Sequence, residues 1–189
     1  MYKDDCIVIN FIGGPGVGKS IITAETFAKL KRKFVAAEIS PEYIKKKLRE
    51  KSLKAIENQI YIFGKQQYQL YANKDDVDVV ITDSPLIFST IYDSTDCPHL
   101  RALILKEFDK YTNVIYYIER DDTIPYEQEG RYQDEDGAKE VDTRVIDFLN
   151  DNGIEYKVVK GIGDDTLQMV VEETVEKLKN GKEETDKNK

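Results

Sequence analysis

An apolar run over Cys6–Ile12 leads without a spacer into an octapeptide that severely limits the possible folds. The octapeptide reads Gly13-Gly14-Pro15-Gly16-Val17-Gly18-Lys19-Ser20. Its glycines let backbone N–H groups turn inward without a Cβ in the way, and a helix over Lys19–Lys33 would add the positive end of its dipole. The pattern therefore predicts a buried strand, a phosphate-binding loop and a helix in succession.

The spacing G-x-x-x-x-G-K-S is the Walker A pattern of proteins that bind nucleoside triphosphates. In this pattern the Lys19 ammonium reaches the β- and γ-phosphates, and the Ser20 hydroxyl ligates Mg²⁺. The pattern alone leaves the reaction open, because kinases, GTPases and ATPases all use such a loop. The residues expected to contact the nucleotide are Gly13, Gly14, Pro15, Gly16, Val17, Gly18, Lys19, Ser20 and Ile21.

Further apolar runs alternate with segments of helical period. The expected strands after the first are Phe34–Ala37, Val77–Thr82, Asn113–Ile118 and Tyr156–Val159. Ser40-Pro41 and Ser84-Pro85 predict helix starts, the first helix reaching about Leu53 and the second starting near Leu86. This alternation predicts the α/β class, with a parallel five-stranded sheet covered by helices on both faces. We expect one domain over 1–180 and a flexible polar tail over 181–189.

Charge is spread unevenly along the chain. The 28 basic and 36 acidic side chains give a net charge of −8, which excludes a generally basic nucleic-acid coat. The window Lys29–Lys54 holds ten basic and three acidic residues, so it carries +7 and leaves −15 elsewhere. This window is either a surface for an anionic partner or a solvated helix face. No apolar stretch is long enough for a membrane span, and two cysteines favour a reducing, cytoplasmic setting.

Two acids follow expected strands. Asp83 directly follows the run Val79–Thr82. It is a candidate to hold Mg²⁺ or to orient the acceptor of a phosphoryl group. The alternative is that Asp83-Ser84-Pro85 only caps a helix. Glu38 follows the expected strand Phe34–Ala37 and is a candidate general base, with a surface glutamate as the alternative. Tyr43 and Lys46, on the next helix, are weaker candidates for acceptor contacts.

Arginines flank a polar segment after the fourth strand. Arg120 and Arg131 are candidates to neutralise a transferring phosphoryl group from a lid over about 120–133, and Arg144 is a weaker one. Salt bridges to the surrounding acids are the alternative interpretation. Gly161 follows the last strand, where this architecture often passes the adenine ring.

The sequence resembles the small P-loop kinases, which include the NadR-type ribosylnicotinamide kinase domain and nucleoside and nucleotide kinases. Within these it is most similar to phage-encoded AAA-family ATPase proteins. The likeness spans residues 6–160 and departs from the family in two ways. The Asp-Gly-Phe-Pro-Arg signature of nucleoside monophosphate kinases is missing, and Glu119-Arg120 does not follow the third strand. The motifs that carry the likeness are the loop at 13–20, Val80-Ile81-Thr82-Asp83-Ser84-Pro85-Leu86, and Gly130-Arg131-Tyr132-Gln133 with Ala138 and Val141-Asp142.

The resemblance implies a three-layer α/β/α sandwich with strand order 2-3-1-4-5. It implies ATP and Mg²⁺ as cofactors, and phosphoryl transfer to a hydroxyl of a nucleoside or nucleotide. Some phage relatives phosphorylate a hydroxymethylated pyrimidine base in DNA, so that base is an alternative acceptor. The setting would then be the host cytoplasm, and a homodimer is the expected assembly.

The resulting hypothesis is a kinase in which Lys19 holds the phosphates, Ser20 and Asp83 serve Mg²⁺, Arg120 and Arg131 act from a lid, and Glu38 or Asp83 is the base. A regulatory ATPase switch without a small-molecule acceptor is the rival interpretation. A GTPase is disfavoured because the sequence has no guanine-reading Asn-Lys-x-Asp pattern.

Overall fold

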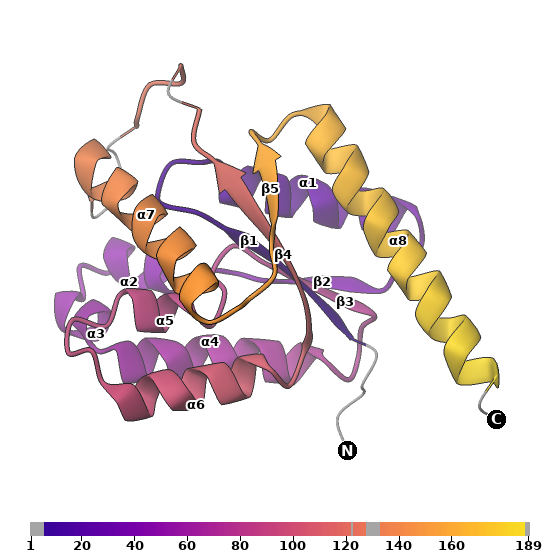
Figure 1. Ribbon diagram of the computed structural model, residues 1–189, viewed down its shortest axis with the longest axis horizontal. Helices are drawn as coiled ribbons and strands as arrows, with labels where there is room; N and C mark the ends of the chain where they lie inside the picture. Colours follow the sequence, from indigo (N-terminus) through magenta and orange to yellow (C-terminus); the bar gives the residue numbers. More distant parts are fainter. Residues whose placement is uncertain (1–5, 122, 128–132, 188–189) are drawn as a thin grey trace.

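The computed structural model describes residues 6–121, 123–127 and 133–187 of the 189-residue chain, with side chains described up to Gly181. At its centre lies a five-stranded sheet in the order β2-β3-β1-β4-β5, in which every neighbouring pair is parallel (Figure 1). The predicted α/β class and strand order are confirmed. The strands are β1 (Ile7–Ile12), β2 (Ala37–Ser40), β3 (Val79–Thr82), β4 (Thr112–Glu119) and β5 (Lys157–Lys160).

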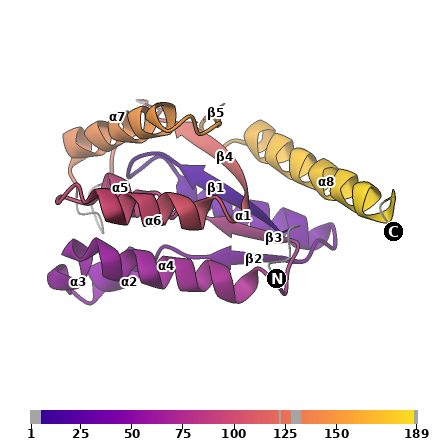
Figure 2. The same ribbon diagram turned by 60° about the horizontal axis from the view of Figure 1, so that its bottom comes forward.

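Helices cover both faces of the sheet, which gives the predicted three layers (Figure 2). One face is covered by α1 (Lys19–Arg32) and α8 (Asp164–Lys187). The other face is covered by α4 (Gln59–Asn73), α5 (Phe88–Ile91), α6 (Pro98–Phe108) and α7 (Glu135–Asp151). Two short helices, α2 (Tyr43–Arg49) and α3 (Leu53–Glu57), connect β2 to α4.

The burial of the central strand, β1, explains why helices pack on both faces of the sheet. All six residues of β1 are buried. Val8 and Ile12 pack into the core beneath α4, α5, α6 and α7, whereas Ile7, Ile9 and Phe11 pack into the core beneath α1 and α8. A strand buried on both faces must be apolar at every position, which is why β1 is a continuous run and not an alternating one. The same strand delivers the loop at residue 13 to the carboxyl edge of the sheet.

The second strand begins at Ala37 and not at Phe34 as predicted. Phe34 is 97% exposed with a φ of +60°, so it forms the turn that leaves α1. The prediction rested on apolar content alone and therefore started the strand too early in the sequence. As a consequence, Glu38 lies inside the strand with its side chain exposed, and buried Ser40 ends the strand.

Two predicted helices are also wrong in extent. The helix expected from Ser40-Pro41 to about Leu53 breaks after Arg49, because Lys51 takes a left-handed φ of +54° that no α-helix contains. The helix expected near Leu86 is only a short turn over Phe88–Ile91. The first break lies between α2 and α3, and the short turn lies between β3 and α6.

The last helix is longer than predicted. It was expected to give way to a flexible tail from residue 181, but α8 is helical up to Lys187. Glutamate and lysine are good helix formers, so polar composition alone did not end the helix. Leu167, Val170 and Val171 anchor its first half in the core. No helix in the described ranges is long and apolar enough to cross a membrane.

Candidate functional site

The loop predicted to bind phosphate lies where β1 ends and α1 begins. Gly18 forms the N-cap of α1 with a left-handed φ of +87°, and no side chain caps the helix there. The first turn of α1 carries no acid. The amino end of α1, with the positive end of its dipole, therefore faces the loop without a competing negative side chain on its own first turn.

A cavity of about 700 Å³ lies beside the loop, within the range of small-molecule sites. Residues 15–21 form one part of its lining, named here the loop wall. Gly161 and Ile162 after β5 also line the cavity, as do Arg120 and Asp121 after β4. A second part of the lining comes from α2, α3 and α4. This helical wall consists of Ile44, Leu48, Ile56, Gln59, Ile62 and Gln66.

Lys19 points back into the loop. Its Nζ donates to the carbonyl oxygens of Gly13 at 2.8 Å and Gly14 at 2.7 Å, and it lies 5.7 Å from the ring centre of Phe88. Burial of the ammonium lowers the pKa of Lys19 to about 8, against the pull of Glu42 and Asp83. Lys19 thus remains mostly protonated at neutral pH and can transfer its hydrogen bonds to phosphate oxygens.

Ser20 and Asp83 come together from α1 and the end of β3. The Ser20 hydroxyl donates to Asp83 Oδ2 at 2.7 Å, and the second carboxylate oxygen, Oδ1, is buried without a hydrogen-bond partner in the described part of the chain. Burial raises the pKa of Asp83, but the nearby Lys45 ammonium and the Ser20 hydrogen bond outweigh it, so the net pKa is lowered. An ionised carboxylate with an unpartnered buried oxygen needs a cation.

These two residues fit Mg²⁺. Magnesium prefers oxygen ligands and usually takes only one or two carboxylates, with phosphates and water filling the other positions. The described residues accordingly hold no group of three or more His, Cys, Asp or Glu side chains arranged for a metal. The Ser20 hydroxyl and the Asp83 carboxylate would supply the protein's share of such a site.

Lys45 on α2 joins the same cluster. Its Nζ donates to Ser20 Oγ, lies 2.9 Å from Asp83 Oδ2 and lies 3.0 Å from Glu42 Oε2. Burial lowers the pKa of Lys45, but Glu42 and Asp83 together raise it above its usual value. Sequence reasoning did not single out Lys45, because it is one of three consecutive lysines and only the fold shows which of them faces the cavity.

Arg120 and Asp142 form the second ionic group at the loop. Arg120 Nε lies 2.6 Å from Asp142 Oδ2, and Arg120 Nη2 donates to the Pro15 carbonyl at 2.8 Å. Asp142 Oδ1 accepts the Gly14 N–H at 2.5 Å. A Cβ on Gly14 would lie 2.4 Å from the Ala138 carbonyl, so only glycine allows α7 to come this close. Asp142 thus ties the loop, α7 and Arg120 together.

The structure places the other predicted residues as follows. Glu38 lies exposed in β2 and is not among the residues that line the cavity, so its role as the base stays a prediction; Glu42, four residues later, lines the cavity. Arg144 donates to the Ile91 carbonyl at 3.1 Å and lies over the Tyr92 ring, so it supports α5. Arg131 lies outside the described residues, as do 122, 128–130 and 132 of the predicted lid over about 120–133.

The weaker acceptor candidates, Tyr43 and Lys46, are not among the residues that line the cavity. The Tyr43 hydroxyl lies 2.5 Å from that of Tyr61, and the Lys46 side chain is exposed. Ile21 and Gly161 both line the cavity as predicted for nucleotide contacts. Asp142 belongs to a motif noted in the sequence, but no spacing rule connected it to Gly14, which is 128 residues away.

Comparisons with known proteins agree with this fold. A family model described as an AAA domain matches residues 8–165. No curated protein sequence matches the chain.

Three solved structures share the fold at low sequence identity. Deoxyadenosine kinase from M. mycoides, solved with bound dATP, has 20% identity and a TM-score of 0.56, covering 91% of this chain and 99% of that one. Thymidylate kinase from Ehrlichia chaffeensis has 16% identity and a TM-score of 0.59, covering 92% and 98%. NadR in complex with NR has 17% identity and a TM-score of 0.58, covering 82% of this chain and 43% of that one.

Proposed function

The chain belongs to the AAA-domain family, and from that premise we propose that it is an ATP-dependent, Mg²⁺-assisted kinase acting on a hydroxyl of a nucleoside or nucleotide. The observation that carries this proposal is the cavity, which continues from the loop wall to the helical wall. A phosphate loop alone fits any NTPase. A further compartment next to the phosphates provides room for a second substrate, as a kinase requires.

The donor half is built from the loop wall and from Gly161 and Ile162. Backbone N–H groups of the loop and the Lys19 ammonium would hold the phosphates. The side chain of Ile162 lies so close to Gly18 that a Cβ there would come within 2.8 Å of it, which brings the segment after β5 against the loop. That apolar contact favours the purine ring of ATP near Gly161 and Ile162.

The acceptor half is built from the helical wall. Ile44, Leu48, Ile56 and Ile62 provide apolar surface for the faces of a base, and Gln59 and Gln66 provide amide groups for its edges. The Gln66 amide donates to Ser40 Oγ at 3.1 Å, so its orientation is fixed before any ligand binds. This mixture of apolar walls with few polar groups is typical of small-molecule sites.

The transfer itself needs positioning and charge neutralisation more than covalent help. The acceptor oxygen forms a bond to the γ-phosphorus while the bond to the β,γ-bridging oxygen breaks, and ADP leaves with that electron pair. The hydroxyl proton passes to the Glu42 carboxylate, which lines the cavity. Asp83, whose pKa is lowered, stays ionised for the metal. Arg120 lines the cavity from the residues after β4 and offsets negative charge on the phosphates.

Mg²⁺ bound at Ser20 and Asp83 would supply Lewis-acid neutralisation of the phosphate oxygens. The protein's own contribution is to hold those two oxygens next to Lys19. Arg131 remains our candidate for a second lid arginine.

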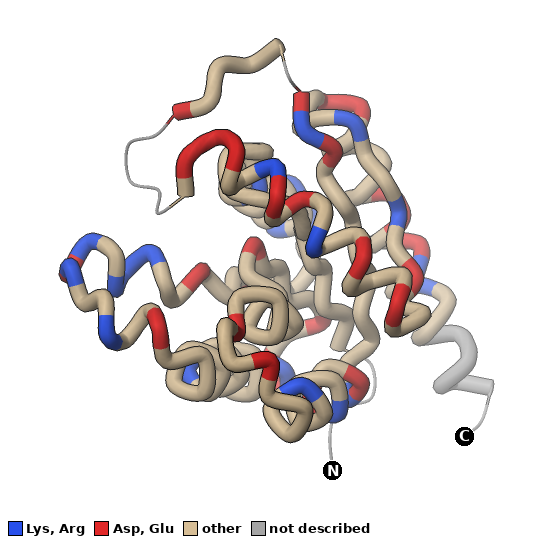
Figure 3. Tube along the Cα trace, turned by 60° about the vertical axis from the view of Figure 1, so that its left-hand side comes forward, with Lys and Arg blue, Asp and Glu red and all other residues tan. Residues whose placement is uncertain are grey.

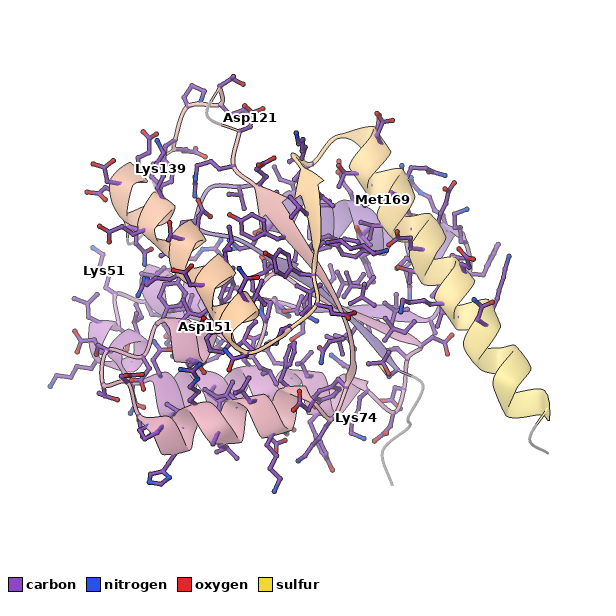
Figure 4. All side chains as sticks on the ribbon, viewed as in Figure 1. Lys51, Lys74, Asp121, Lys139, Asp151 and Met169 are labelled. Carbon is purple, nitrogen blue, oxygen red and sulfur yellow. The ribbon has the colours of Figure 1, made fainter. Side chains whose placement is uncertain are left out.

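A base within DNA is the second candidate acceptor, favoured by the charge on the outside of the helical wall. Lys46, Arg49, Lys51 and Lys54 are exposed on α2, α3 and the turn between them. Basic residues gather on the left of the molecule in Figure 3, and Lys51 projects from the same edge in Figure 4. This acceptor predicts a steep loss of activity with rising salt, because each neutralised phosphate releases counter-ions. A free nucleoside predicts a shallow salt dependence.

The test is an acceptor screen with γ-labelled ATP and Mg²⁺. It covers nucleosides, mononucleotides, ribosylnicotinamide and DNA containing hydroxymethyluracil. We expect label in one acceptor class with the wild-type protein and none with Lys19→Ala, and retained transfer with the control Lys29→Ala. ATP hydrolysis without a labelled product from any acceptor would instead support the regulatory ATPase.

A further inference from the structure

Three protein oxygens surround the Lys45 ammonium. They are Ser20 Oγ, Asp83 Oδ2 at 2.9 Å and Glu42 Oε2 at 3.0 Å. A hydroxyl and two carboxylates are the ligands that Mg²⁺ prefers, and two of these oxygens belong to the proposed metal residues. The ammonium therefore occupies the position that fits the metal best.

The buried negative charge of Asp83 explains why a cation is needed next to these oxygens. The Asp83 carboxylate has a side chain only 6% exposed, and removing the partner of a buried charge is costly. Lys19 interacts with both Asp83 and Glu42, but its own hydrogen bonds go to the loop carbonyls. Among the described residues, Lys45 is the cation in direct contact with Asp83.

We propose that Lys45 is a built-in counter-ion that competes with Mg²⁺ for the oxygens of Ser20 and Asp83, so that metal binding displaces its side chain. This inference rests on the proposed metal site. A unit positive charge and a divalent ion within a few ångströms of each other repel strongly, so the two cannot share these ligands.

The displacement needs no refolding. The Lys45 side chain is 42% exposed and its long stem can turn about several single bonds while α2 stays in place. Lys45 itself lines the cavity, so its displaced ammonium stays beside the phosphates and can bind an anionic oxygen there. Displacement also releases Glu42, the proposed base, from its ion pair. Metal binding would thereby prepare the acceptor side of the site.

The experiment compares Lys45→Met with Lys46→Met, a neighbouring exposed lysine whose loss changes the net charge equally. Mn²⁺ is titrated into each protein without nucleotide, and free Mn²⁺ is followed by electron paramagnetic resonance. We expect Lys45→Met to bind Mn²⁺ about tenfold more tightly than wild type, because a repelling charge is gone. Lys46→Met should bind like wild type. Equal affinity in the two variants, or weaker binding by Lys45→Met, overturns the proposal.

Two further measurements locate the effect. Adding Asp83→Asn to Lys45→Met should abolish the gain in Mn²⁺ affinity; a gain that persists would place the metal elsewhere and contradict the proposal. The melting temperature of Lys45→Met in EDTA should lie below that of Lys46→Met, and Mn²⁺ should restore it, because Asp83 regains a counter-ion. A melting temperature that Mn²⁺ does not change counts against the proposal.

The outcome is separable from the proposed kinase activity. Tighter Mn²⁺ binding by Lys45→Met together with no labelled acceptor would leave the counter-ion standing and remove the kinase. Labelled acceptor together with unchanged Mn²⁺ binding would do the reverse.

Discussion

The loop wall is held by hydrogen bonds from Lys19 to the buried Gly13 and Gly14, although most of its own residues are half-exposed or exposed, whereas the helical wall is carried partly on the short helices α2 and α3. Gly14 and Lys19 are fixed by Asp142 and by loop carbonyls, and the loop follows a fully buried strand. On the other side, α2 has no fully buried residue and ends next to Lys51 with its left-handed φ. The side that would hold the common donor is rigid, and the side that would choose the acceptor can change at little cost to the fold.

This contrast predicts that substitutions in the loop wall act strongly on every reaction of the site. Lys19→Ala removes the ammonium that would hold the β- and γ-phosphates. We expect kcat/KM for ATP to fall about a thousandfold, as for loss of a transition-state contact. Steady-state kinetics with the best acceptor measure this, and Lys29→Ala should stay close to wild type. Near-normal activity of Lys19→Ala would contradict the expectation that substitutions in the loop wall act strongly on every reaction of the site.

Glycine substitutions next to the loop wall and on α4, which carries part of the helical wall, sharpen this comparison. Gly14→Ala places a Cβ 2.4 Å from the Ala138 carbonyl and 2.6 Å from Asp142 Oδ1, so the loop must move. We expect a loss of about 1–3 kcal/mol in unfolding free energy and about a hundredfold in ATP affinity.

The matched control is Gly64→Ala on α4, where a Cβ meets no atom of the described residues within 4 Å. It should stabilise the protein by about 0.5–1 kcal/mol through helix propensity. Urea unfolding and calorimetric titration of an ATP analogue give both quantities. Similar effects of the two substitutions would show that the loop is not specially constrained.

Asp142 tests whether the loop is held from α7. Asp142→Asn keeps the shape of the side chain but loses the charge that pairs with Arg120. We expect unfolding free energy to fall by about 1–3 kcal/mol and kcat/KM to fall about tenfold, because Arg120 and Gly14 lose their common anchor. Asp147→Asn, an exposed position on the same helix, is the control and should be neutral. Equal behaviour of the two variants would assign Asp142 no positioning role.

The smallest expected effect is a pH dependence that belongs to Lys19. Because its folded-state pKa is about 8, the ammonium begins to lose its proton above that pH, and kcat/KM for ATP should fall by up to about tenfold per unit. Stability changes in the opposite direction. The unfolded chain keeps this proton up to the ordinary lysine pKa, so between about pH 8 and that value the Lys19 contribution to stability rises with pH.

Lys19→Arg checks both statements, because a guanidinium stays charged over this range. The variant should lose the decline in kcat/KM above pH 8, even if its activity is lower throughout. A decline that persists in Lys19→Arg would assign the titration to another group.

The sequence predicted the features that follow from local patterns and missed those that depend on packing between distant segments. The loop, its order with β1 and α1, and the sheet order followed from an apolar run, a fixed spacing and a family likeness. Asp83 was found because strand ends gather at one sheet edge. Glu38 was expected after the end of its strand but lies inside it, because Phe34, which is apolar like a strand residue, forms an exposed turn. Lys45 and Asp142 depend on packing between distant segments, and no local pattern separates Lys45 from Lys46.

The most direct test of the proposed donor site is a crystal structure with Mg²⁺ and a non-hydrolysable ATP analogue. We expect the triphosphate to lie in the loop with Lys19 Nζ on its oxygens, the metal between Ser20 and Asp83, and Lys45 turned away from both. A structure in which the analogue binds elsewhere, with Lys19 still bonded to the Gly13 and Gly14 carbonyls, would contradict this proposal.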